Sequence, residues 1–326
     1  MNTKNYSIEA YRFFFTAVIV LHHAGSGLGV DFLKHGYICV EFFFILSGFF
    51  LLKSFNKENQ HDLTGFVIKR FKRLGPDYWF ALGVMMVGIV LFTSGKIDYI
   101  RIVLEAMFLQ NIGIFSYGGG YNYPCWYLSV LMTGSALIYV SLCFNKKIVL
   151  LLSSFYCLIF YTYLFSLPTI ENWGSYAGLY YPLWRGIADM LLGCLLAEYS
   201  RKVAASSIWY LVELVCFAVV LQGIFLSRNI DSVVVLAMMG LIFVTTRNLG
   251  VLSKVLNHRF FNWGGYIAYP MYVNHAFILL LINYTYDKYD VPINSFTPAL
   301  ILVIVIGYSI GTSLLVKLLM SKLKTQ

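Results

Sequence analysis

Charged residues are scarce in this chain of 326 residues, which is 12% Asp, Glu, Lys and Arg and 59% hydrophobic. A soluble protein carries roughly 25% charged residues, so this sequence cannot cover a water-facing surface. No part of it is long and polar enough for a separate soluble domain, and it contains neither an internal repeat nor a low-complexity tract. The composition therefore predicts an all-α polytopic membrane protein, forming a single domain over residues 1–326.

Cysteine is also sparse, and its spacing shows no pattern. The six cysteines are scattered without a C-x-x-C pair, and no two histidines have the spacing of metal ligands. Most of the cysteines lie in apolar runs, where cysteine behaves as a small hydrophobic residue. We therefore expect neither a disulfide framework nor a metal site.

The chain carries a net charge of +9, which raises the question of nucleic-acid binding. Its basic residues, however, sit in short loops between apolar runs and do not gather on one face. Positive charge in the cytoplasmic loops of a membrane protein explains this distribution better. We expect membrane lipids as partners, and no nucleic acid.

Apolar runs of about 20 residues, the length that spans a membrane, occur ten times in the sequence. They predict a bundle of about ten transmembrane helices at roughly 8–27, 36–54, 77–94, 126–144, 147–166, 178–199, 206–226, 231–247, 264–283 and 298–319.

Loop charges test this count. With the N-terminus inside, 17 of the 24 Lys and Arg residues fall in cytoplasmic loops and five in outer loops. The asymmetry alternates from loop to loop, as the positive-inside rule requires. It predicts that both termini are cytoplasmic.

The first predicted helix contains two charged or titratable groups on one face, Arg12 and His23. Eleven residues of α-helix return to within roughly 20° of the same face and rise about 16 Å. His22 lies about 100° away from that face. Polar groups at membrane depth are costly and tend to mark function, and histidine is the usual general base. An interfacial histidine bonded to a neighbouring helix is an equally good interpretation of His23 alone.

Glu41 lies shortly after the outer start of the second predicted helix, at about the depth of His23. A carboxylate there could accept the second N–H of the imidazole and fix its tautomer. The alternative is a glutamate that faces water at the helix end.

Four cations in five residues precede the third predicted helix, and two of them, Arg70 and Arg73, share a helix face. They could bind anionic lipid or set topology. The sharper hypothesis is a phosphate site, because arginine pairs bidentately with phosphate. Arg12 would lie on the same side of the membrane.

Other polar groups have mainly structural interpretations. Arg185 and Asp189, four residues apart, predict an ion pair within one helix. His275 follows a proline in the ninth predicted helix. Either His275 or the Arg185–Asp189 pair could line a path through the bundle, although a structural use is slightly favoured. The outer segment 95–125 could contain a short helix within Ile100–Ile114 and suits either a sugar acceptor or a plain connector.

Four motifs together resemble the membrane-bound acyltransferase-3 family over the whole chain. They are Arg12 with His23, GYICVEFFFILSGFFL (36–51), KRFKRLGPDYW (69–79) and GGYIAYPMYVNHA (264–276), in the family's order and spacing. The resemblance places the family's functional residues on Arg12, His23, Glu41, Arg70 and Arg73. One departure is at Trp126–Tyr127–Leu128, where many members have Trp-Ser-Leu followed by a glutamate that this chain lacks.

The resemblance implies an O-acyltransferase of the bacterial cytoplasmic membrane. It would move acetyl from cytoplasmic acetyl-CoA to a hydroxyl of an envelope glycan such as O-antigen, capsule or exopolysaccharide. We expect His23 and Glu41 to be catalytic, with Arg12, Arg70 and Arg73 binding the donor. The alternative is an exporter of a lipid-linked glycan or polysaccharide, although a transporter has no need for a coenzyme A site.

Overall fold

The structure is a computed structural model. It describes residues 4–29, 32–58, 61–93, 95–113, 120–167, 169–171, 174–176, 179–200, 203–226, 230–290, 292–294 and 296–324.

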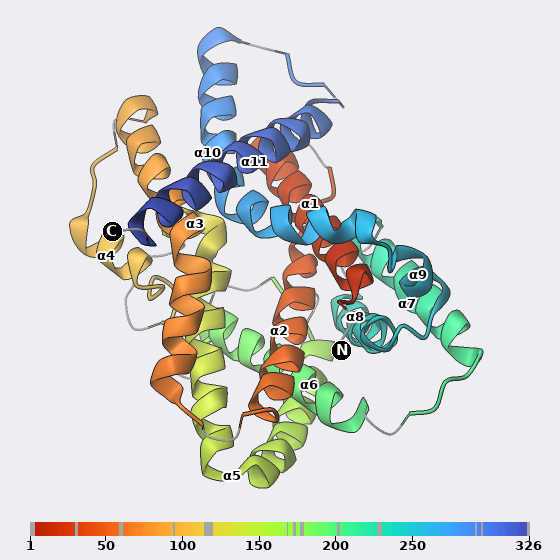
Figure 1. The fold of residues 1–326 in the computed structure, drawn as a ribbon. Helices are drawn as coiled ribbons and strands as arrows, with labels where there is room; N and C mark the ends of the chain where they lie inside the picture. The colour runs from red at the N-terminus through yellow and green to blue at the C-terminus, as the bar shows by residue number, and fades with distance from the viewer. Residues whose placement is uncertain are drawn as a thin grey trace.

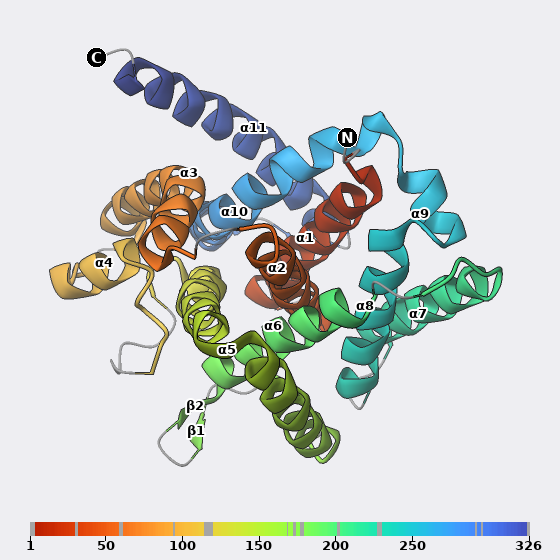
Figure 2. The same ribbon diagram turned by 60° about the horizontal axis from the view of Figure 1, so that its bottom comes forward.

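The described chain is almost entirely helical (Figures 1 and 2). A two-residue antiparallel pair, β1 (Ser175–Tyr176) and β2 (Leu179–Tyr180), and three short 3₁₀ turns, η1 (Gly36–Ile38), η2 (Tyr123–Cys125) and η4 (Arg259–Phe261), complete it. The helices are α1 (Tyr6–Gly27), α2 (Cys39–Phe55), α3 (Leu63–Phe92), α4 (Tyr99–Ala106), α5 (Trp126–Phe165), α6 (Tyr181–Tyr199), α7 (Ile208–Phe225), α8 (Asp231–Arg247), α9 (Val251–Leu256), α10 (Asn262–Tyr289) and α11 (Thr297–Lys324).

Each of the ten predicted apolar runs lies largely on a helix, which confirms the all-helical prediction. Among the described residues, six helices are long and apolar enough to cross a membrane: α2, α3, α5, α7, α10 and α11. Helix α6 carries Arg185, Asp189 and Glu198, and α8 has only 17 residues. Ten spans with cytoplasmic termini therefore stay a prediction.

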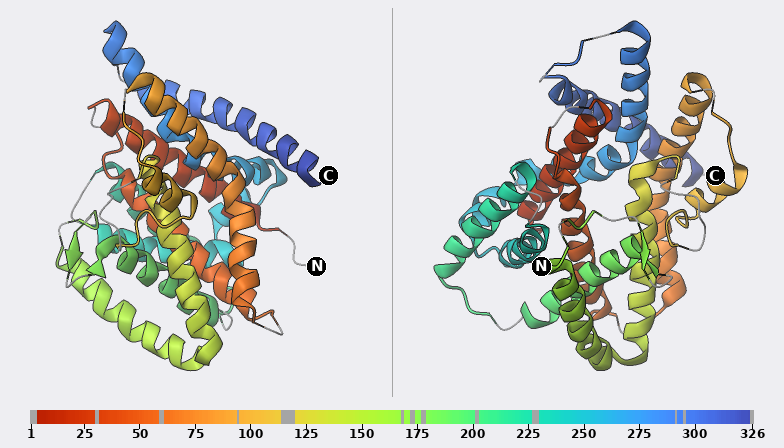
Figure 3. Two further views of the ribbon diagram at one scale, coloured as in Figure 1. Left: turned by 90° about the vertical axis from the view of Figure 1, so that its left-hand side faces the viewer. Right: turned by 180° about the vertical axis from the view of Figure 1, so that it is seen from behind.

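Helix α5 contains two of the predicted runs, which meet at Asn145 (Figure 3). The backbone of Asn145 leaves the helical region, with φ −162° and ψ 99°. Its side chain accepts hydrogen bonds from the backbone N–H groups of Lys147 and Ile148, at 3.1 and 3.2 Å. Asn145 thus caps the second leg, in the way Asn caps helix N-termini generally, and the chain turns back on itself there.

Helix α2 lies at the centre of the bundle against α6 (Figure 2). Two glycines allow the close approach, since a Cβ at Gly48 would lie 1.8 Å from the Met190 carbonyl oxygen. A Cβ at Gly193 would lie 2.0 Å from the Ile45 carbonyl oxygen. Small residues serve this purpose in membrane helix pairs. The packing fixes α2, and with it Glu41, relative to Arg185 on α6.

Helices α1 and α10 lie side by side although they come from opposite ends of the chain (Figure 1). Their shared apolar cluster includes Val20 and Ala24 of α1 and Ile267 and Met271 of α10. This packing brings the second half of α1, where His23 lies, against the middle of α10.

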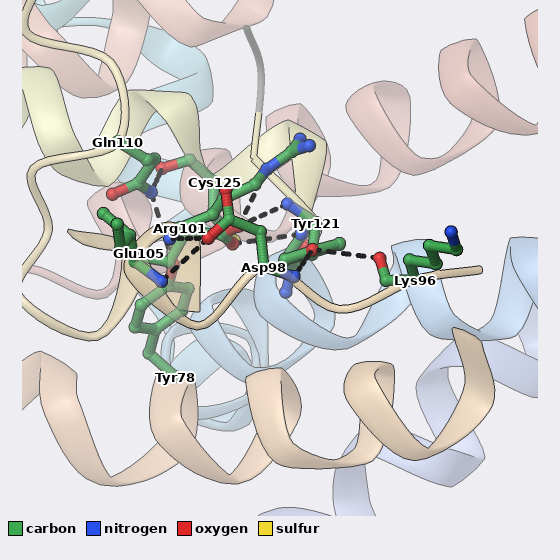
Figure 4. Close-up of polar contacts among 10 residues, drawn as sticks. Tyr78, Lys96, Asp98, Arg101, Glu105, Gln110, Tyr121 and Cys125 are labelled. Atoms are coloured by element: carbon green, nitrogen blue, oxygen red, sulfur yellow. Dashed lines mark hydrogen bonds and ion pairs between the residues drawn. The ribbon is translucent and has the colours of Figure 1, made fainter. Parts of the chain in front are cut away.

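The outer segment predicted at 95–125 contains the short helix α4. The buried carboxylate of Glu105 holds the described part of this segment in place through hydrogen bonds (Figure 4). Glu105 accepts hydrogen bonds from the backbone N–H groups of Tyr121 and Asn122, the latter at 3.2 Å. Arg101 lies 3.7 Å from Glu105 and stacks over the Tyr121 ring. Burial raises the pKa of the Glu105 carboxyl, while the backbone donors and Arg101 act to lower it. The described part of this segment is therefore anchored rather than a loose connector.

Candidate active site

Two histidines from opposite ends of the chain form the centre of the site. The Nδ1 atom of His23, on α1, lies 2.8 Å from the Nε2 atom of His275, on α10. The two rings are nearly parallel, with 7° between their planes and 5.0 Å between their centroids. His275 in turn places its Nδ1 atom 2.6 Å from the backbone carbonyl oxygen of Tyr272. The result is a chain of two hydrogen bonds through two imidazoles.

This chain determines where the protons sit when both rings are neutral. A carbonyl oxygen only accepts, so Nδ1 of His275 carries a proton and its Nε2 accepts. The Nδ1 atom of His23 must then donate, which leaves the Nε2 atom of His23 unprotonated. That nitrogen has the lone pair a general base requires.

His23 lines a cavity of about 40 Å³ together with His22, Arg185, Trp126 and residues of neighbouring elements. A water molecule needs roughly 10–15 Å³ on this measure, so the cavity holds a few waters or a small acyl group. His22 contributes to the same cavity, but its Nδ1 atom lies 3.0 Å from the carbonyl oxygen of Leu33. The two adjacent histidines therefore have different partners, although both reach the cavity.

Glu41 has a different partner from the one expected from sequence. Its Oε1 atom lies 3.1 Å from the Nε atom of Arg185, and both side chains are buried. Both Glu41 and His23 are described residues, and no hydrogen bond or ion pair joins them. The expected contact between Glu41 and the His23 imidazole is thus replaced by two others. His23 forms a hydrogen bond with His275, and Glu41 forms an ion pair with Arg185.

Arg185 is held from several directions. Its Nη1 atom donates to the carbonyl oxygen of Ile170 at 2.7 Å, and the guanidinium lies 5.0 Å from the Trp126 ring centroid. Arg185 forms its ion pair with Glu41 and not, as predicted, with Asp189, which accepts a hydrogen bond from Tyr161 and still acts electrostatically on Arg185. Arg185 is therefore a fixed cation that reaches the wall of the His23 cavity.

The three arginines expected to bind phosphate have one electrostatic neighbour in common. Arg12, Arg70 and Arg73 all act electrostatically on the buried Tyr127, at the start of α5. Arg12 also forms an ion pair with Glu9 at 2.9 Å. Like charges repel at close range, so a cluster of three guanidinium groups favours an anionic ligand. Arg70 is half-buried and Arg73 is exposed at the surface of the described chain.

Sequence reasoning noted His275 and Arg185 as polar groups within spans, slightly favoured a structural use, and did not assign them to the site with His23. His275 is 252 residues from His23 in the chain, and the motif that contains it gives no indication of a contact with α1. Tyr123, whose ring centroid lies 5.4 Å from that of His23, belongs to the η2 turn. The signal in the sequence was a polar residue inside an apolar run; it indicated no partner for His275 and only the local partner Asp189 for Arg185.

The described residues contain no group of three His, Cys, Asp or Glu side chains that could hold a metal ion. All six cysteines are described, and all are free.

Two comparisons with known proteins both find acyltransferases. A family model described as an acyltransferase domain matches residues 5–318. The peptidoglycan O-acetyltransferase OatA of Listeria monocytogenes serovar 1/2a is 23% identical over an alignment of 321 positions. That alignment covers 84% of this chain and 49% of OatA, so the chain spans about half the length of this curated relative. No solved structure matches the chain.

Proposed function

Because this chain belongs to the membrane-bound acyltransferase-3 family, we propose that it transfers an acetyl group from cytoplasmic acetyl-CoA to a hydroxyl of a cell-envelope glycan. The observation that carries the proposal is the hydrogen-bond chain that leaves His23 Nε2 as a free base. The similarity to a peptidoglycan O-acetyltransferase supports an envelope glycan as the acceptor. The protein would act as a multi-pass enzyme of the bacterial cytoplasmic membrane.

His23 acts as the general base. Its Nε2 atom takes the proton of the acceptor hydroxyl while that oxygen bonds to the thioester carbonyl carbon. The carbon–sulfur bond then breaks, and the coenzyme A thiolate leaves with the proton from the imidazolium. Proton transfer of this kind contributes typically 10²–10⁴-fold to a rate.

His275 positions His23 without touching the reacting atoms. By accepting from Nδ1 of His23, it holds the ring in the tautomer that presents Nε2 as the base. A neutral imidazole fills the position that a carboxylate holds in a serine protease triad. The backbone carbonyl of Tyr272 fixes His275 in turn.

Arg185 stabilises the negative charge that develops on the thioester oxygen. It lines the His23 cavity, and its position is held by Glu41 and the Ile170 carbonyl. One fixed donor to an oxyanion is worth roughly 10²–10³-fold in rate. We therefore assign Glu41 a role through Arg185 rather than through His23.

Arg12, Arg70 and Arg73 bind the phosphates of the donor. They gather around Tyr127, and the rise of α1 separates Arg12 from His23 by about 16 Å. A donor with its phosphates at the arginines would have to extend its thioester along α1 to reach the base. This geometry suits coenzyme A, which carries its phosphates and its thioester at opposite ends.

The test is acetylation in cells. His23→Ala should remove acetyl from the surface glycan, measured by mass spectrometry, at membrane expression equal to wild type. His258→Ala, at an exposed histidine outside the site, is the matched control and should leave acetylation unchanged. Wild-type acetylation in His23→Ala would refute the assignment. Loss of the glycan itself from the surface would favour export instead.

A further inference from the structure

The cavity at His23 has an exposed carboxylate in its wall. Ten residues line this cavity, all of them described, and Glu171 is the one among them that is exposed. The others are buried or half-buried, His23 and Arg185 included. Glu171 therefore marks the mouth of the cavity, where a substrate from solution would enter. The chemistry assigned to His23 and Arg185 leaves this carboxylate without a role.

The backbone just before Glu171 is held by three other elements. Asp231, at the start of α8, accepts a hydrogen bond from the backbone N–H of Ile170 at 2.8 Å. The same Asp231 oxygen accepts from the hydroxyl of Tyr37, in η1, at 2.8 Å. The carbonyl oxygen of Ile170 accepts from Arg185 on α6 at 2.7 Å. These bonds give Glu171 a fixed place at the cavity, although it belongs to neither a helix nor a strand.

The carboxylate of Glu171 has charged and polar neighbours but no direct partner. It acts electrostatically on His22, Tyr37 and Arg185. Among the described residues, however, its side chain forms neither a hydrogen bond nor an ion pair, and Arg185 is already paired with Glu41. An ionised carboxylate only accepts hydrogen bonds. A ligand with hydroxyl donors would therefore find two free acceptor oxygens at the mouth of the cavity.

We propose that Glu171 binds the acceptor, by accepting a hydrogen bond from a sugar hydroxyl close to the one that reacts. This inference rests on the proposed acetyl transfer, because it concerns a substrate of the same cavity. A sugar carries several hydroxyls, so one can bond to Glu171 while another reaches Nε2 of His23. Hydrogen bonds to an ionised group are roughly twice as strong as neutral ones, and a few well-placed polar groups suffice to orient a ligand.

The position and charge of Glu171 suit the acceptor better than the donor. The topology predicted from loop charges puts the connection between the fifth and sixth predicted helices outside, where an envelope glycan arrives. A carboxylate repels the phosphates of coenzyme A, and those phosphates are assigned to the arginines near Tyr127. Glu171 would thus select among acceptors without contributing to donor binding.

The test compares the KM values for the two substrates. The purified full chain in neutral detergent receives labelled acetyl-CoA and surface glycan, isolated from the producing cells and freed of O-acetyl groups by mild alkali. Glu171→Ala should raise the KM for the glycan at least about tenfold, which corresponds to about 1.4 kcal/mol. The KM for acetyl-CoA should stay within about twofold of wild type, since the carboxylate does not bind the donor. Glu171→Gln keeps a carbonyl oxygen that accepts hydrogen bonds and should recover part of the loss.

Asp287→Asn is the matched control. Asp287 is an exposed carboxylate near the end of α10 and does not line the cavity. Its replacement removes the same charge and should change the KM for the glycan less than about twofold, because exposed charges interact weakly at a distance.

A KM for the glycan within twofold of wild type in Glu171→Ala would overturn the inference. An equal rise in Asp287→Asn, or an equal rise in the KM for acetyl-CoA, would also overturn it. In these cases the wild type still transfers acetyl, so the proposed function stands. Absence of transfer by the wild type would instead overturn the proposed function, and this inference with it.

Discussion

The imidazole pair of His23 and His275 carries the chemistry at the scale of single residues. The Tyr272 carbonyl fixes the tautomer of His275, and His275 in turn fixes the tautomer of His23. The sequence placed Arg12 and His23 on one helix face by spacing alone. It could not pair His23 with His275, since the contact depends on how α1 packs against α10.

His275→Ala should lower kcat by about 10–100-fold, by analogy with the loss of the outer partner of a metal-bound histidine. The KM for acetyl-CoA should stay near wild type, because the arginines that bind the donor are untouched. His275→Gln keeps an acceptor oxygen for the Nδ1 proton of His23 and should recover part of the loss. The measurement is steady-state kinetics of both variants across pH. Equal losses in the two variants, with an unchanged pH profile, would show that His275 is only a packing residue.

Glu41→Gln should destabilise the protein by about 3–5 kcal/mol, because it removes the carboxylate that forms an ion pair with the buried guanidinium of Arg185. Replacing both partners, as Glu41→Gln with Arg185→Met, should recover part of that stability, since the ion pair is then removed as a whole. Thermal unfolding in detergent compares the two variants. A double variant less stable than the single one would contradict the ion pair. Activity should be low in both, because each disturbs Arg185.

At the scale of helices, the close contact of α2 with α6 determines the geometry of the site. Gly48→Ala should destabilise the fold by roughly 1–3 kcal/mol, because the added methyl group overpacks the contact with the Met190 carbonyl. Gly83→Ala, on α3, where an added Cβ would meet nothing within 4 Å, is the matched control and should not destabilise. Thermal unfolding midpoints measure both. Equal midpoints for the two variants would show that the α2–α6 contact tolerates a side chain.

Helix positions were predictable because apolar runs of membrane length leave few alternatives. Helix α9 was not predicted, because its six residues are too short and mixed to form a distinct apolar run. The two legs of α5 were separated by the polar residues around Asn145, and the structure confirms a break there. The partner of Glu41 was not predictable, since Arg185 and Asp189 on one helix offered a local pairing that the α2–α6 packing overrides.

At the scale of the whole molecule, the membrane topology is the main prediction. Ten spans put Asn145 in the cytoplasm and the segment after α5 outside, whereas a single long α5 span would not return the chain to the outer side. Alkaline phosphatase fused after residue 145 should be inactive, and phosphatase fused after residue 167 should be active. A green fluorescent protein fused at the C-terminus should fluoresce. Phosphatase activity at residue 145 would contradict the ten-span topology.

The donor and the acceptor are expected on opposite sides of the membrane, with His23 and its cavity between them. Both groups of residues depend on the assembled bundle. Arg12, Arg70 and Arg73 come from α1 and α3, and His23 and His275 come from α1 and α10. Helix α1 contributes to both groups, so it connects donor binding at one end with proton transfer near the other.

Transfer by the purified protein in liposomes tests the central claim most directly. Labelled acetyl-CoA is supplied on the cytoplasmic side and an envelope glycan on the outer side, and label on the glycan is counted over time. Wild-type protein should transfer acetyl, and His23→Ala should transfer at least about 100-fold more slowly with an unchanged unfolding midpoint. Transfer by His23→Ala at the wild-type rate would contradict the account.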